Sequence, residues 1–326
     1  MEKFRTSAER KRISALGNNK QYGIVFPGGG AKGAFQIGVW KYLHEYGYDQ
    51  WFTGISGTSV GALNSLLFAS GSYENAERTW LNVQQKDITP PDFNPVDLSD
   101  PKGFFINSLP PVVALKVAHA LSKKLARLSL YSQDGLKKLI TNSSINWPNV
   151  HFESKLIYST LSQKTPPHGS GNDSHKFFSR FSKPEYRCWA GLDNQDVIDT
   201  VLGSASIPFA YPSQHISGKN YKDGGIYDNI PIRPLVQAHF ETILVIHLSR
   251  AKNLKFKREW DESIAGLADD PTVSTHVYQV FPPDEFEDGC SAMLTVNPPL
   301  SRQRIEQGYQ AACKQLFDLF PPRIIA

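Results

Sequence analysis

The residues of this chain that are best suited to chemistry begin with a serine between two glycines. Gly57-Thr58-Ser59-Val60-Gly61 fits G-x-S-x-G, the pattern of a turn that lifts a nucleophilic serine above a sheet. A serine hydroxyl is inert at neutral pH until a base takes its proton. The pattern alone arises by chance in about one chain of this length in ten, and a Gly-Ser turn that only caps a helix is the plain alternative. The question is therefore which base would serve Ser59.

Histidine is the usual base for such a serine, and an α/β-hydrolase would place an acid and then a histidine after the nucleophile. The histidines in the expected region are His215, His239, His247 and His276. His247 lies in a predicted apolar strand and is expected to pack in the core. No flanking pattern marks any of the others as catalytic, so the sequence selects none of them.

Asp223 is a second candidate for the base. It ends a short strand-like segment and precedes Gly224 and Gly225, which would allow a tight turn and a close approach of two backbones. An aspartate normally titrates near ~3.9, so burial would have to raise its proton affinity before it could serve a hydroxyl. A surface Asp-Gly turn is the plain alternative, and Asp228 is a rival carboxylate.

A glycine-rich segment supplies the third element. Gly28, Gly29, Gly30, Ala31, Lys32 and Gly33 lie between a predicted strand and a predicted helix. Backbone N–H groups of such a turn, at a helix N-terminus, form a cradle for an anion. For an acyl-transfer serine, this cradle would be the oxyanion hole.

The same glycines also fit G-x-G-x-x-G, the pattern of a dinucleotide-binding turn. That function expects an acidic residue at the end of the second strand. Asp49 instead precedes the second predicted strand, which ends in the serine turn. The segment also lacks the Gly-Lys-Ser/Thr of a phosphate-binding loop, so nucleotide binding is the weaker hypothesis.

The elements around these motifs predict a parallel sheet covered by helices. Predicted strands are Tyr22–Phe26, Trp51–Ser56, Lys155–Thr160 and Thr242–Leu248; predicted helices are Ala31–Gly47, Val60–Ala69, Asp196–Leu202 and Arg302–Phe320. Strands and helices alternate in the first 70 residues, which is typical of a parallel sheet. Ile88–Pro111 and Ser162–Pro184 are expected to be irregular and to border a cleft.

The three motifs, in this order, resemble those of the patatin-like phospholipase family. The family combines a glycine loop, a G-x-S-x-G turn and a D-G-[GA] turn, matched here by residues 28–33, 57–61 and 223–225. Ala205-Ser206-Ile207-Pro208, with Pro212, is similar to a small-residue block that the family carries before the aspartate. Asn229 and Pro231 are similar to its N-x-P. The resemblance spans about residues 22–234, and no essential position departs from the pattern.

The resemblance implies a three-layer α/β/α fold with a mostly parallel central sheet. It implies a lipid acyl hydrolase of phospholipase A or lysophospholipase type. Ser59 would be the nucleophile and Asp223 the proton acceptor, in a dyad that uses no histidine. The glycine loop would hold the oxyanion, and no metal, calcium or other cofactor is implied. Lys32 would either support the loop or attract a phosphate headgroup, which the sequence does not decide.

Composition and charge limit the remaining possibilities. A net charge of +4 over 326 residues is too small to indicate nucleic-acid binding. No apolar run reaches the ~18 residues of a membrane span, and the N-terminus lacks the apolar region of a secretory signal. Three widely spaced cysteines predict thiols in a reducing compartment. We therefore expect a cytoplasmic protein that attaches peripherally to membranes.

The domain organisation follows from these patterns. Residues 1–20 are expected to be a solvated basic arm and residues 21–326 a single catalytic domain. That domain would contain the motif core, 22–234, and a C-terminal extension, 235–326, whose role the sequence does not give.

Two segments suggest how the protein would reach lipid. Pro111–Ser129 places aliphatic residues on one helical face and four cations elsewhere, which suits a helix on anionic lipid, a lid or a core helix. The segment 175–181 alternates basic and aromatic residues and fits an interface or an edge strand. A catalytically silent lipid-binding or regulatory protein and a different esterase on the same fold remain alternatives. The sequence does not reveal an activating partner.

Overall fold

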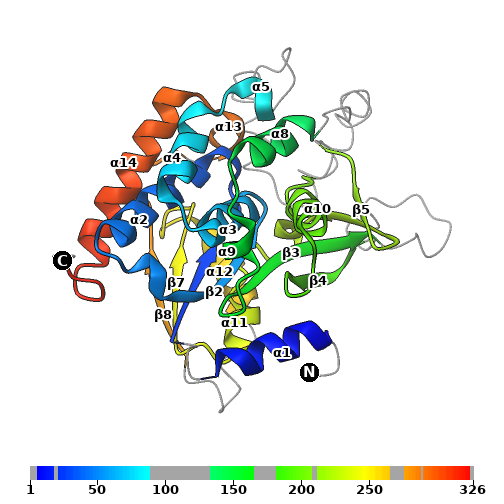
Figure 1. The fold of residues 1–326 in the computed structure, drawn as a ribbon. Helices are drawn as coiled ribbons and strands as arrows, with labels where there is room; N and C mark the ends of the chain where they lie inside the picture. The colour runs from blue at the N-terminus through cyan, green and yellow to red at the C-terminus, as the bar shows by residue number, and fades with distance from the viewer. Residues whose placement is uncertain are drawn as a thin grey trace.

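The computed structural model describes residues 6–17, 21–88, 133–164, 181–207, 211–264, 275–287 and 289–323. Its centre is one eight-stranded sheet in the order β5-β6-β3-β2-β1-β7-β8, with β4 also paired to β3 (Figure 1). The strands are β1 (Tyr22–Phe26), β2 (Phe52–Thr58), β3 (Leu156–Lys164), β4 (Phe181–Cys188), β5 (Gln214–Ile216), β6 (Lys219–Asp223), β7 (Thr242–Ile246) and β8 (His276–Val280). The run β3-β2-β1-β7-β8 is parallel, whereas β4, β5 and β6 form an antiparallel edge. The predicted mostly parallel sheet is confirmed.

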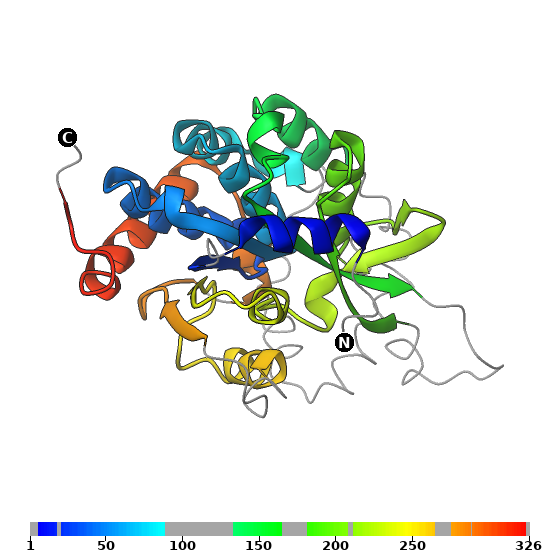
Figure 2. The ribbon, with the colours of Figure 1, turned by 60° about the horizontal axis from the view of Figure 1, so that its bottom comes forward.

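Helices cover both faces of this sheet, as Figures 1 and 2 show. One face carries α2 (Ala34–Glu45), α3 (Val60–Ser70), α4 (Tyr73–Asn82), α8 (Asp134–Asn142), α9 (Trp147–Val150), α10 (Asn194–Ser204) and α14 (Pro298–Gln315). The other carries α1 (Ser7–Leu16), α11 (Arg233–Gln237) and α12 (Leu254–Ile264). Short helices η2 (Gly30–Gly33), η3 (Asp49–Trp51), α5 (Gln85–Ile88), η7 (Gly224–Ile226) and α13 (Gly289–Leu294) lie in the connections. The fold is thus a three-layer α/β/α arrangement.

Most predicted elements lie where the sequence placed them, and the differences have local causes. The first predicted helix begins three residues late, at Ala34, because Gly30–Gly33 form a separate 3-10 turn. Helix α14 begins four residues early, because the side chain of Asn297 caps it by accepting a hydrogen bond from the N–H of Leu300. Gly71 ends α3 in the left-handed conformation, as expected.

The N-terminal segment differs from the expected solvated arm. Residues 7–16 form α1, and Leu16 is buried with the core of the second face. Arg12 donates hydrogen bonds of 2.8 Å to the carbonyls of both Phe152 and Lys155, just before β3. Tyr158 on β3 donates one of 2.8 Å to the carboxylate of Glu9. Arg12 therefore helps to attach this helix to the sheet.

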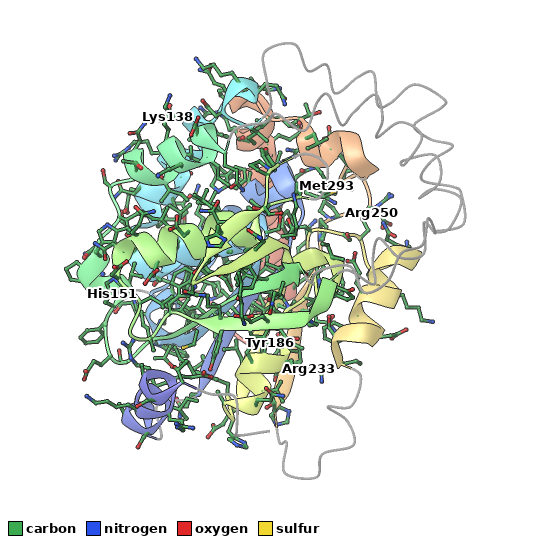
Figure 3. The ribbon with its side chains drawn as sticks, turned by 90° about the vertical axis from the view of Figure 1, so that its right-hand side faces the viewer. Lys138, His151, Tyr186, Arg233, Arg250 and Met293 are labelled. Atoms are coloured by element: carbon green, nitrogen blue, oxygen red, sulfur yellow. The ribbon has the colours of Figure 1, made fainter. Side chains whose placement is uncertain are left out.

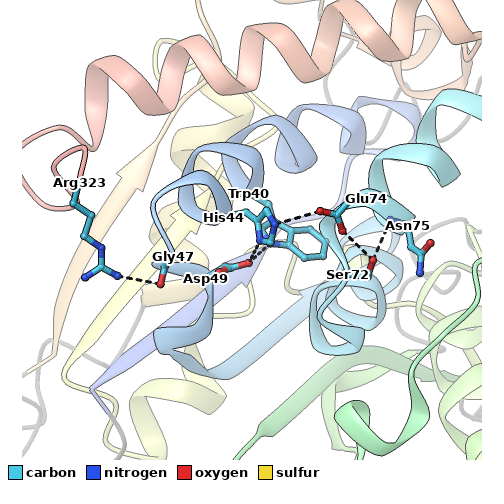
Figure 4. A network of polar contacts seen from close by, with 8 residues as sticks. All are labelled: Trp40, His44, Gly47, Asp49, Ser72, Glu74, Asn75 and Arg323. Atoms are coloured by element: carbon cyan, nitrogen blue, oxygen red, sulfur yellow. Dashed lines mark hydrogen bonds and ion pairs between the residues drawn. The ribbon is translucent and has the colours of Figure 1, made fainter. Parts of the chain in front are cut away.

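The C-terminal extension is built into the same core. It supplies β7 and β8 to the sheet, and α14 packs directly on α2. At this crossing a Cβ on Gly38 would lie 1.8 Å from the carbonyl oxygen of Ile305, so only glycine allows the approach. After α14, Arg323 donates to the carbonyls of Tyr46 (2.7 Å) and Gly47 (3.2 Å), fixing the chain end beside α2 (Figure 4).

Several predictions fall outside the described residues. These are the helix Pro111–Ser129, nearly all of the irregular segment Ile88–Pro111, and positions 165–180 of the second irregular segment. Within the described ranges, none of the helices combines the length and apolar character needed to cross a bilayer.

Candidate active site

Ser59 lies at a sharp turn between the end of β2 and the start of α3. Its φ of 57° and ψ of −126° are rare for a residue with a side chain and carry strain of ~1–3 kcal/mol. The flanking glycines make the turn possible: a Cβ on Gly61 would lie 1.8 Å from the carbonyl oxygen of Phe26, and one on Gly57 would lie 2.2 Å from that of Gly61. The strand–turn–helix context expected around G-x-S-x-G is therefore present.

A second serine holds the main chain of this turn. The N–H of Ser59 donates a 2.9 Å hydrogen bond to Oγ of Ser204, and that hydroxyl donates one of 2.7 Å to the carbonyl of Thr160 on β3. Ser204 is fully buried at the end of α10. Ser204 was not among the residues predicted from the sequence. Its only signal was a place among the small residues just before the Ala205-Ser206 block.

Asp223 is at the end of β6, and the structure brings it to Ser59. The Ser59 hydroxyl lies close enough to the Asp223 carboxylate to lower its pKa. The N–H of Gly225 donates a hydrogen bond of 2.8 Å to this carboxylate, because the Gly224–Ile226 turn folds back over the side chain. The N–H of Asp223 donates to the carbonyl of Ser206 at 3.0 Å, so the small-residue block helps to hold the aspartate backbone.

Burial makes Asp223 a better base than an ordinary aspartate. The side chain is almost inaccessible to solvent, and desolvation raises its pKa from 3.8 to about 6. The Ser59 hydroxyl and the N–H of Gly225 act in the opposite direction, because they stabilise the charged form. With a pKa of about 6 the carboxylate is ionised at neutral pH, yet it holds a proton far more readily than an exposed aspartate does.

The glycine loop lies directly against the serine. A Cβ on Gly28 would lie 3.0 Å from Cβ of Ser59, so the two backbones approach closely. Asn229 fixes this approach, since its carbonyl accepts from the N–H of Gly28 (3.2 Å) and its side-chain amide donates to the carbonyl of Gly28 (3.3 Å). The predicted N-x-P residue thus ties the glycine loop to the turn that follows Asp223.

Two residues of the loop face the cavity in which Ser59 lies. Gly30 and Ala31 line that cavity and are the first residues of η2, where N–H groups have no intrahelical partner. Gly28 is different, because its N–H is directed to Asn229. Lys32 is only 3% exposed, and this burial favours a role in supporting the loop over attraction of a headgroup.

The cavity beside Ser59 is predominantly apolar. It has a volume of about 70 Å³, which is below the ~300–1,000 Å³ typical of small-molecule sites. Its walls come from the glycine loop, α3, α4, α5, α8, α13 and the chain after α10, and its apolar side chains include Val60, Leu63, Trp80, Leu136, Met293 and Leu294. Such a lining suits the hydrocarbon part of an ester whose reacting end lies at Ser59.

The rival carboxylate has a structural role. Asp228 is buried, and its carboxylate accepts hydrogen bonds from the Tyr186 hydroxyl (2.5 Å), the Ser263 hydroxyl (2.7 Å) and the N–H of Ile230 (3.1 Å). Figure 3 labels Tyr186 of this cluster and, apart from it, Met293 of the cavity wall. The hydrogen bonds of Asp228 join β4, α12 and the chain after η7.

The four candidate histidines are engaged or placed elsewhere. His247 is buried, stacks on Phe281 and contacts Gln279, and burial lowers its pKa to about 3. His215 lies on β5 beside Asn220, His276 begins β8, and His239 lies in the turn after α11. None of them lines the cavity of Ser59. The expectation that His247 packs in the core is confirmed.

The structure also weakens the dinucleotide hypothesis. Asp49 precedes β2 in η3, and its carboxylate accepts from Trp40 Nε1 (3.1 Å) and His44 Nδ1 (2.7 Å), as Figure 4 shows. The Asp49 carboxylate is thus hydrogen-bonded at the N-terminal end of β2, and the glycine loop lies at the opposite edge of the sheet. Among the described residues, no group of three or more His, Cys, Asp or Glu side chains is arranged to hold a metal ion.

A family model described as patatin-like phospholipase matches residues 24–236. Similar solved structures include VipD from Legionella pneumophila (15% identity, TM-score 0.48, covering 92% of this chain and 67% of that one). Human GIVD cytosolic phospholipase A2 has 9% identity and a TM-score of 0.48, covering 96% of this chain and 62% of that one. The type III effector protein ExoU has 14% identity and a TM-score of 0.42, covering 92% of this chain and 53% of that one. The chain thus spans between 53% and 67% of these proteins. No curated protein matches it.

Proposed function

Because the chain belongs to the patatin-like phospholipase family, we propose that it hydrolyses fatty-acyl esters of phospholipids with Ser59 as nucleophile and Asp223 as base. Membership of this family already supports a lipid ester hydrolase. The observation that carries the finer proposal is the closeness of the Ser59 hydroxyl to a buried Asp223, whose pKa it lowers, beside an apolar cavity.

The acylation step follows from this geometry. Ser59 Oγ attacks the ester carbonyl carbon as Asp223 accepts the hydroxyl proton. Negative charge develops on the carbonyl oxygen, and the N–H groups of Gly30 and Ala31 are the proposed donors to it. As the carbon–oxygen bond of the ester breaks, Asp223 returns the proton to the leaving alkoxide. The lysophospholipid departs, and the acyl group stays on Ser59.

Deacylation uses the same groups in the same way. Water attacks the acyl-enzyme carbonyl while Asp223 accepts a proton from it. The tetrahedral species collapses, Ser59 Oγ leaves and receives the proton, and the free fatty acid is released. The strained backbone at Ser59 keeps Oγ exposed to the cavity throughout, since the turn cannot relax into the regular helix that follows.

Phospholipid substrates reside in membranes, so we propose that the protein works peripherally at a membrane surface. Its C-terminal extension belongs to the same catalytic domain in this proposal, because β7, β8 and α14 are part of one core with the motif-bearing elements.

Mass spectrometry of phospholipid vesicles incubated with the protein tests the proposed function. Wild type is expected to release free fatty acid and lysophospholipid in equal amounts, and Ser59→Ala neither. Ser14→Ala, which changes an exposed serine on α1, is the matched control and should behave as wild type. Equal release by folded Ser59→Ala would overturn the proposal. So would the absence of fatty acid from phospholipid, lysophospholipid and triacylglycerol alike.

A further inference from the structure

We propose that Arg304 is a positioning residue of this active site, which joins the glycine loop to the α13 wall of the acyl cavity. An acyl chain that contacts this wall would then bear on the same unit that aligns the oxyanion donors. The inference rests on the proposed function and deepens it, by naming what links acyl-chain recognition to the reacting end.

The contacts of Arg304 define this unit. Its side chain, on α14, is 1% exposed. One terminal nitrogen, Nη1, donates to the carbonyls of Ala31 and Thr295, both at 3.0 Å. The other, Nη2, donates to the carbonyl of Ala292 at 3.0 Å and to the carboxylate of Glu287 at 2.8 Å. A single planar group thus holds the glycine loop and both ends of the α13 region.

The α13 region is a wall of the acyl cavity and touches the glycine loop directly. Met293 and Leu294 line the cavity that contains Ser59. Gly30, with φ of 57°, lies so close to α13 that a Cβ on it would be 2.2 Å from the carbonyl oxygen of Met293. The wall is therefore in direct contact with the segment that carries the proposed oxyanion donors.

Gln85 of α5 holds the same wall from the other side. Its side-chain amide donates to the carbonyl of Leu294 at 2.7 Å and accepts from the N–H of Val296 at 3.0 Å. Gln85 therefore pairs with the main chain as a neighbouring strand would. Its two hydrogen bonds run to the main chain of the wall, whereas Arg304 also bonds the glycine loop. Variants of Gln85 and Arg304 can therefore distinguish the effect of the wall from the effect of its connection to the loop.

The burial of the charged Arg304 side chain indicates that the arrangement of its hydrogen bonds is important. Burying a guanidinium is costly unless its donors are satisfied, and its carboxylate partner, Glu287, is half exposed. An apolar side chain could fill the same space on α14 without that cost. Arginine instead supplies several donors in a fixed plane, which lysine cannot reproduce. Arg304 and α13 both lie beyond residues 24–236, so this wall belongs to the part of the chain outside the family match.

The test compares Arg304→Lys with Gln85→Leu on a short and a long soluble ester, p-nitrophenyl butyrate and p-nitrophenyl laurate. For Arg304→Lys we expect kcat to fall roughly ten- to a hundredfold on both esters, because the oxyanion donors shift. For Gln85→Leu we expect an unchanged kcat on the butyrate and a higher KM on the laurate, because only the wall is loosened. Arg302→Lys, an exposed change on the same helix, should match wild type.

The outcomes separate this inference from the proposed function. If wild type cleaves both esters and Arg304→Lys keeps the wild-type kcat and KM, Arg304 is only a structural residue and the inference fails. The same holds if both variants lose activity solely in proportion to their unfolded fraction, measured by circular dichroism. If Arg304→Lys does not fold, an unchanged laurate KM in Gln85→Leu overturns the inference. Failure of the proposed function appears instead as wild type that cleaves neither ester.

Discussion

At the scale of single residues, the account depends on a carboxylate that acts where histidine is more usual. Asp223 gains its basicity from burial, and it retains a charge at neutral pH because the Ser59 hydroxyl and the N–H of Gly225 both stabilise the charged form. Burial and hydrogen bonding shift the pKa in opposite directions, and burial is the larger effect. The result is a base that titrates near the pH at which it must work.

The pH dependence of the reaction follows from this pKa. Only ionised Asp223 can accept the serine proton, so kcat/KM for a soluble ester should rise about tenfold per pH unit below pH 6 and level off above it. Steady-state assays from about pH 4 to about pH 8 measure this. An inflection near the ordinary aspartate value of 3.8 would contradict the raised pKa of Asp223.

Ser204 provides a second test at this scale. Replacing it with alanine leaves the N–H of Ser59 and the carbonyl of Thr160 buried without their partner, which we expect to cost ~1–3 kcal/mol of unfolding free energy and to lower kcat. Thr200→Ala on the same helix is the control, because that hydroxyl donates only to the carbonyl of Asp196 within α10. Urea unfolding and ester hydrolysis measure the two effects. Equal losses in the two variants would remove Ser204 from the site.

At the scale of elements, the close crossing of α2 and α14 positions the glycine loop. The loop leads directly into α2, and α14 carries Arg304 behind it. Glycines on both helices permit the contact: a Cβ on Gly308 would lie 2.0 Å from the carbonyl oxygen of Phe35, and one on Gly38 would meet Ile305. The C-terminal helix is therefore part of the support of the site.

Gly38→Ala tests this support. The added methyl group would force the two helices apart, so we expect a loss of about 1–3 kcal/mol or more of unfolding free energy. Gln310→Ala, an exposed change on α14, should stay within about 0.5 kcal/mol of wild type. Chemical denaturation followed by circular dichroism compares them. A Gly38→Ala protein as stable as wild type would show that the crossing relaxes freely.

The elements were predictable where local patterns were strong. The apolar run of β1 and the glycine that ends α3 are local signals, and both elements lie where they were expected. The packing of α1 was not predictable, because its attachment depends on carbonyls 140 residues away that Arg12 reaches. Helix α13 was not predicted either, because its sequence has no clear helical pattern and its importance comes from contact with Gly30.

At the scale of the whole molecule, the sheet explains why distant motifs meet. Ser59 follows β2, and the glycine loop follows β1, its parallel neighbour, so both lie at the same edge of the sheet. Asp223 lies at the end of the antiparallel strand β6, which pairs with the C-terminal end of β3. The three loops could be identified from their sequence motifs alone. Ser204, which holds the serine turn, and Arg304, which holds the glycine loop, come from elsewhere in the chain and carry no motif.

The most direct test of the central claim is the covalent labelling of Ser59 by a fluorophosphonate probe, located by peptide mass spectrometry in wild type and in Asp223→Asn. The probe reacts only with an activated serine, so the account predicts labelling of Ser59 in wild type and its loss in Asp223→Asn. Asp284→Asn, which changes an exposed aspartate paired with Lys252, should label as wild type does. Labelling of Ser59 in Asp223→Asn at the wild-type rate would contradict the account, because the serine would then be activated by another group.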